Sequence, residues 1–74
     1  MKELLNKEIE MEDGSKYIVI ETASIEKKNY VLLSNISDVL DSEFAEVKVE
    51  DGNLVFETVI DTKTKFELMK LMQD

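Results

Sequence analysis

Carboxylates are the main side chains in this sequence that can do chemistry. The chain of 74 residues contains 17 Asp and Glu, but no His and no Cys. Without imidazole or thiol there is no Ser-His-Asp triad, no cysteine nucleophile and no His- or Cys-ligated metal. The remaining options are carboxylate acid–base catalysis, cation binding and electrostatic attraction of a basic partner.

The arrangement of these acids does not favour catalysis or metal binding. Acid–base catalysis by paired carboxylates needs a pocket that keeps one of them protonated. A short chain with two Gly has little room for such a cleft, and it contains neither a Gly-x-Ser-x-Gly turn nor a Gly-rich phosphate loop. The acidic pairs Glu12-Asp13 and Glu50-Asp51 do not fit the calcium-loop pattern. We therefore expect no enzymatic activity, no metal and no cofactor.

The negative charge is concentrated in one third of the chain. Residues 38–61 contribute −7 of the net charge of −8. One interpretation is that these acids keep the protein soluble and protect a sheet edge. The other is an anionic patch for a basic protein partner, whereas direct nucleic-acid binding is not expected because phosphates repel the chain. The residues expected to form the patch are Glu43, Glu46, Glu50, Asp51 and Glu57.

Two Asp-Gly pairs indicate where the chain reverses. Asp13-Gly14 and Asp51-Gly52 each lie between apolar-rich runs, and Asp-Gly favours the positive φ angles of a type I′ hairpin turn. A two-residue turn at Asp51-Gly52 would place Glu46 directly opposite Glu57. The same register would place a set of apolar residues on the other face of the hairpin. These are Val47, Val49, Leu54 and Phe56.

Two further strands are expected between these hairpins. Tyr17–Ile20 and Tyr30–Leu33 are continuous apolar runs, as in central strands, and the polar segment 26–29 is short enough for a third hairpin. Ser37 to Glu43 interrupts the pattern and is expected to form either a helical turn near Ser37–Asp41 or a loop.

The last segment changes to helical periodicity. Phe66, Met69 and Met72 or Leu71 recur at helical spacing, and Leu68 lies four residues before Met72, which predicts a helix over Lys65–Gln73. The run 64–67 (Thr-Lys-Phe-Glu) matches the capping-box pattern, and Asp61 is an earlier alternative cap. The sequence therefore predicts a single α+β domain over residues 1–74. It would be a five-stranded antiparallel meander closed by a short C-terminal helix.

One short helix can cover only one face of such a sheet. The runs Tyr17–Ile20 and Tyr30–Leu33 send apolar side chains to both faces, because side chains alternate along a strand. The sheet could curl or a lid could cover the second face, and otherwise a second copy or a partner must cover it. Of these three covers, we expect either a homodimer through this face or the lid. The lid would be the Met1–Lys7 segment, with Leu4 and Leu5 turned inward.

Several segments together resemble a known family. These are the first hairpin, the run 28–33 (Lys-Asn-Tyr-Val-Leu-Leu), the acidic stretch before 46–49 (Glu-Val-Lys-Val), and the closing segment with Asp61 and Phe66-Glu67. The chain resembles the small acidic bacterial proteins of the YrzB type, found mainly in low-GC Gram-positive bacteria. The resemblance implies a fold and a compartment but no activity. The Lys-, Ile-, Asn- and Glu-rich composition also fits a phage or mobile-element protein from such a host.

The functional expectation is a protein-binding module. An acidic hairpin would dock on a basic protein surface, as a small inhibitor or a nucleic-acid mimic, and the partner would then be a nucleic-acid-binding protein. The alternative is a structural or self-assembling homodimer. The start of the chain lacks the apolar core of a signal peptide, and no run approaches the roughly 20 apolar residues of a membrane helix. A cytoplasmic protein without membrane contact is therefore expected.

Overall fold

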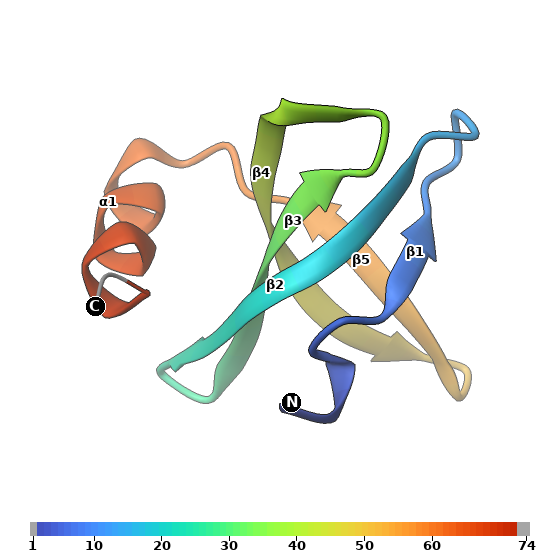
Figure 1. Ribbon diagram of the computed structural model, residues 1–74. Coiled ribbons are helices and arrows are strands. Elements are labelled where there is room, and N and C mark those ends of the chain that lie inside the picture. Colours follow the sequence, from blue (N-terminus) through green and yellow to red (C-terminus); the bar gives the residue numbers. More distant parts are fainter. Residues whose placement is uncertain (1, 73–74) are drawn as a thin grey trace.

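The computed structural model describes residues 2–72, and it shows a curled β-sheet followed by a helix (Figure 1). Five strands pair in the order β1-β2-β3-β4-β5, all antiparallel, so the expected meander closed by a C-terminal helix is confirmed. With one short α-helix the architecture is mainly β rather than α+β. The elements are the 3₁₀ turn η1 (Lys2–Leu4), β1 (Glu8–Glu10), β2 (Lys16–Ile25), β3 (Lys28–Asn35), β4 (Asp38–Glu50), β5 (Asn53–Thr58) and α1 (Thr62–Leu71).

The sheet bends into a half-barrel, with β1 and β5 at its two edges (Figure 1). The strand register shifts between Val19 and Glu21 in the β2–β3 pair, and between Ser34 and Asn35 in the β3–β4 pair. Such bulges bend a strand and increase its local twist. They therefore account for a curl that a regular five-stranded ladder would lack.

The concave face of the half-barrel holds the main core. Val19, Val31 and Leu33 are fully buried there. Leu4, 8% exposed, packs against them from η1, whereas Leu5 remains 37% exposed. The second face of the sheet is therefore covered by curling and by Leu4, two of the three covers that the sequence allows.

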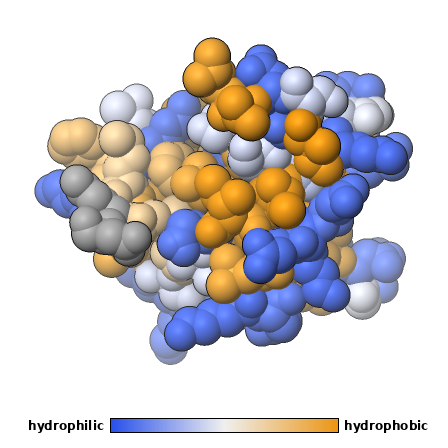
Figure 2. All heavy atoms as spheres, viewed as in Figure 1, coloured by the Kyte–Doolittle hydropathy of each residue, from blue (hydrophilic) through white to orange (hydrophobic). Residues whose placement is uncertain are grey.

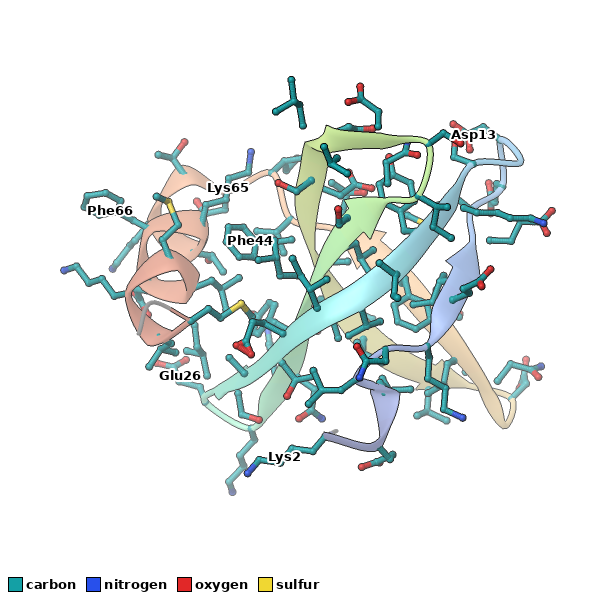
Figure 3. All side chains as sticks on the ribbon, viewed as in Figure 1. Lys2, Asp13, Glu26, Phe44, Lys65 and Phe66 are labelled. Atoms are coloured by element: carbon teal, nitrogen blue, oxygen red, sulfur yellow. The ribbon has the colours of Figure 1, made fainter. Side chains whose placement is uncertain are left out.

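The convex face carries α1. Leu68 is fully buried against Tyr30 and Val59, and Met72 packs at the edge of this cluster. Phe66, by contrast, is 61% exposed and points away from the sheet (Figure 3). The helical periodicity thus located the helix, and the expected pair Leu68 and Met72 packs on the sheet, whereas Phe66 and Met69 are exposed.

Asp61 begins the helix. Its Oδ2 accepts hydrogen bonds from the Thr64 backbone N–H at 2.9 Å and from Thr64 Oγ1 at 2.6 Å. These bonds satisfy an N–H group that the first helical turn leaves free, and they lower the pKa of Asp61. The alternative cap, Asp61, is the one used, so the helix begins at Thr62 and the expected start at Lys65 is wrong. Gln73, the expected helix end, lies outside the described residues.

The two Asp-Gly turns differ. Asp51 (φ 52°) and Gly52 (φ 80°) form the expected two-residue turn, closed by Glu50 opposite Asn53. Asp13-Gly14 instead lies in a longer loop, residues 11–15, because only Gly14 there adopts a positive φ of 88°. The Asp13 side chain accepts a hydrogen bond from the Ser15 N–H at 2.9 Å, which shapes this loop.

The expectation of a helical turn or loop over Ser37–Glu43 is wrong, because β4 already begins at Asp38. Ser37 donates its N–H to Asn35 Oδ1 at 2.8 Å and Asp38 Oδ1 accepts from the Leu40 N–H at 3.1 Å, so these polar residues form turn bonds rather than a helix cap. Pairing with β3 sets the strand, and the shift in register leaves residues 39–41 outside the ladder.

We expect Leu4→Ala to lower the free energy of unfolding by about 2 to 3 kcal/mol, because it removes a side chain buried in the concave core. The matched change Leu5→Ala, one position along, should cost less than about 1 kcal/mol because Leu5 is more exposed. Urea denaturation of both variants measures the difference. Equal effects of the two changes would contradict a lid formed by Leu4.

A second stability prediction concerns the β2–β3 turn, where Glu26 (φ 49°) and Lys27 (φ 70°) occupy left-handed conformations without any Gly. Lys27→Gly should raise the free energy of unfolding by about 0.5 to 1 kcal/mol, because Gly adopts this conformation without strain. Lys28→Gly, one residue into β3, serves as the control and should lower it by a similar amount. Destabilisation by Lys27→Gly, measured in urea, would show that this turn is not strained.

Candidate acidic binding surface

The β4–β5 hairpin has the expected register. Glu46 lies directly opposite Glu57. Lys48 relieves this like-charge opposition, because its Nζ lies 3.1 Å from Glu57 Oε2. The hydrogen bond and the charge of Glu57 raise the pKa of Lys48. The hairpin face is therefore less acidic than its sequence indicates.

The five acids expected to form one patch do not all lie together in the structure. Glu50 and Asp51 lie at the hairpin tip, and Glu46 lies on the convex face, where it lines a further hollow with Glu57 and Lys28. Glu43 and Glu57 line a cleft at the open side of the half-barrel, where Thr58 Oγ1 donates a hydrogen bond to Glu43 Oε2 at 3.4 Å. Only two of the five predicted residues therefore share a hollow with the other acids described next.

This cleft, the β1–β5 seam, lies between the two edges of the curled sheet. It consists of two adjoining hollows of about 540 and about 230 Å³, which share Met11, Glu12 and Phe56. Its lining contains five carboxylates and no basic side chain. The acids are Glu10, Glu12, Asp13, Glu43 and Glu57, the apolar residues are Ile9, Met11, Tyr17, Leu54, Val55 and Phe56, and Thr58 completes the seam.

Hollows beside the helix have mixed charge. Lys28 and Lys63 line one of them together with two Glu, and Lys65 lines another, between α1 and the sheet, opposite Glu43. Phe44 projects toward this helix side of the sheet, whereas Asp13 lies at the far end of the molecule on the β1–β2 loop (Figure 3). The one-sign charge of the seam therefore sets it apart from these hollows.

The sequence did not identify Glu10, Glu12 and Asp13 as part of this surface. Glu12 and Asp13 were interpreted as turn residues, which they are. Their proximity to β5 depends on the curl of the sheet, which brings the first hairpin beside the last (Figure 1). No local pattern signals that curl.

A polar network closes one end of the seam. The Tyr17 hydroxyl donates to Asp41 Oδ2 at 3.0 Å, and the same oxygen accepts from Asn35 Nδ2 at 3.0 Å. The hydrogen bond to Asp41, the burial of Tyr17 and the charge of Glu43 raise the pKa of the Tyr17 phenol. Asp13 has a lowered pKa, because it accepts hydrogen bonds from the backbone and side chain of Ser15. Asp13 therefore keeps its charge to lower pH.

Within residues 2–72 no group of three or more acids is arranged to hold a metal ion. None of the helices in that range has the length and apolar character needed to cross a membrane. Comparison of the chain with protein-family models, curated proteins and solved structures found no match. The resemblance to YrzB-type proteins therefore stays a prediction from residue patterns.

The raised pKa of Tyr17 is directly measurable. In a Tyr30→Phe variant, Tyr17 is the remaining tyrosine, and its ultraviolet titration should have a midpoint above 10.0. Asp41→Asn should move the midpoint downward. Because the folded chain holds the phenolic proton more tightly than the unfolded chain, this interaction stabilises the fold below pH 10 and is lost as the pH rises through the Tyr17 pKa. A midpoint at or below 10.0 would contradict the Tyr17–Asp41 bond.

Proposed function

We propose that this protein is a non-enzymatic protein-binding module that binds a basic segment of another protein. The observation that supports this proposal is the composition of the β1–β5 seam, which combines five carboxylates with an apolar floor and lacks any basic side chain. All nine Lys of the chain lie outside that lining.

The geometry of the seam favours a cationic ligand. Like charges around a concave, partly apolar surface strengthen one another's field, because the low-dielectric walls focus it. The field attracts Lys and Arg side chains and speeds their encounter with the seam. Half-buried Met11 and Phe56 add apolar area that a purely ionic contact would not provide. A basic segment that also carries apolar residues therefore fits best.

A role as an inhibitor or nucleic-acid mimic is the finer form of this proposal. Carboxylates held on a rigid sheet present negative charge as phosphates do, so they compete for Lys and Arg that hold a polyanion. The partner would then be a nucleic-acid-binding protein, and the module would block its binding surface. The chain's charge of −8 supports this form.

The alternative function, a self-assembling homodimer, rests on a different surface. Val39 and Leu40 at the β3–β4 end are 80% and 92% exposed, and Ile36 beside them is 46% exposed. Apolar side chains gather there and over the face that carries β2 and β3 (Figure 2). Exposed apolar patches of this kind are typical of interfaces. This association would hold or strengthen with salt, whereas charge-driven binding weakens.

The test compares two charge reversals that change the net charge equally. Glu10→Lys/Glu12→Lys alters the seam, and Glu26→Lys/Glu67→Lys alters exposed acids away from it. Fluorescence anisotropy with a labelled oligolysine peptide should show about tenfold weaker binding for the seam variant and a much smaller change for the control. Affinity of the unaltered protein should fall between about 0.05 and 0.5 M NaCl.

Three results would contradict this proposal. Equal weakening by both double reversals would show that the peptide responds to net charge rather than to the seam. A third double reversal, Glu46→Lys/Glu50→Lys, alters the outer face and tip of the β4–β5 hairpin. A loss of binding confined to this variant would place the site there rather than in the seam. Self-association that increases with salt, measured by analytical ultracentrifugation, would instead favour the homodimer.

A further inference from the structure

The sheet ends on two edges that face each other across the seam. Within the described residues β1 pairs with β2 alone and β5 with β4 alone. Because strand direction alternates along a meander, the first and fifth strands run the same way. A barrel closed by antiparallel pairs alone needs an even number of strands, so an odd number of added strands would complete this one, and a single inserted strand would be antiparallel to both edges.

The β5 edge offers unpaired backbone groups to such a strand. Alternate residues of an antiparallel strand bond to the same neighbour. The Val59 N–H donates to the Phe44 backbone oxygen at 2.9 Å, which continues the β4–β5 register. The odd-numbered residues of β5 therefore direct their backbone N–H and C=O groups at β4. The backbone groups that face the seam therefore belong to Leu54, Phe56 and Thr58.

The β1 edge is arranged in the same way. The Met11 N–H donates to the Ser15 oxygen at 2.8 Å, and the Val19 N–H donates to the Lys7 oxygen at 3.0 Å. The odd-numbered residues of this segment therefore direct their backbone N–H and C=O groups at β2. The backbone groups of β1 that face the seam are those of Glu8 and Glu10.

We propose that an extended segment of a partner protein, with basic and apolar residues in alternation, adds to the sheet as a sixth strand in the β1–β5 seam. This inference rests on the proposed function and specifies how the partner binds. Side chains on the concave side of the added strand meet Ile9 and Phe56, which pack on the core. Side chains on its convex side meet Glu10 and Glu57. Because the seam is apolar on its concave side and acidic on its convex side, it favours a strand in which apolar and basic residues alternate.

A second copy of this chain fits the seam less well. Its own free edges are β5, which ends in Glu57-Thr58, and β1, in which Glu8 and Glu10 flank Ile9. Either edge would bring further carboxylates beside the five in the lining, and each copy carries a charge of −8. Like charges side by side disfavour pairing. The charge therefore favours a basic partner.

The test uses two peptide probes with equal numbers of Lys, one alternating Lys and Val and the other oligolysine. Amide hydrogen exchange of the full protein is followed by NMR. The alternating peptide should bind more tightly, and it should slow exchange at the amides of Leu54, Phe56 and Thr58. The Val55 amide, already directed at β4, should change little.

Proline substitution tests the backbone contact itself. Leu54→Pro removes a seam-facing N–H while leaving the β4–β5 bonds in place, which an edge strand tolerates, and Leu54→Val keeps the N–H. The Pro variant should bind the alternating peptide about fivefold more weakly than the Val variant, the effect of one hydrogen bond. If Leu54→Pro fails to fold, methylation of the peptide's own backbone nitrogens at alternate positions should produce a similar loss with the unaltered protein.

The outcomes separate strand addition from binding by charge alone. If the alternating peptide binds no more tightly than oligolysine and no seam amide slows, strand addition is wrong while the proposed function stands. If neither peptide binds, both are wrong. If the free protein is already a dimer with slowed seam amides, the added strand is a second copy and the partner segment is excluded.

Discussion

The burial of one apolar face inside a curled sheet is the constraint on which the rest of this structure depends. A sheet of this size with one short helix has two faces to shield, and α1 shields part of the convex face. The register shifts near Val19 and Ser34 bend the strands until the concave side chains pack against one another, and Leu4 completes that core. The same bend brings β1 near β5 and so creates the seam. Core and candidate site therefore have a common cause.

Local chemistry was enough to predict the features that depend on a few neighbouring residues. Asp51-Gly52 supplies two positive φ angles, so the β4–β5 register followed, and with it the opposition of Glu46 and Glu57. Asp61 could be identified as a cap because its side chain satisfies an N–H group three residues later. The α1 helix followed from its apolar spacing.

Features set by distant parts of the chain were not predictable in this way. Residues 38–43 have no strand pattern of their own, and Asp38, Ser42 and Glu43 are extended because β3 offers each of them a partner. Lys48 was not expected to neutralise Glu57, although the predicted register makes them diagonal neighbours. Membership of Glu10 and Glu12 in the seam depends on bulge positions, which no short motif specifies. The acids expected on one hairpin surface therefore lie at several places in the structure, and the acids of the seam come from different hairpins.

The meander order has a consequence for how the chain assembles. Each strand pairs with its neighbour in sequence, so most of the sheet forms through short loop closures with a small entropy cost. Packing Ile9 and Met11 of the first hairpin and Phe56 of the last against one core is different, because a contact through this core joins segments more than 40 residues apart. A contact of this kind is expected to form late in folding and to open early when the native state fluctuates. The first and last hairpins are therefore expected to separate while the central strands β2, β3 and β4 remain paired.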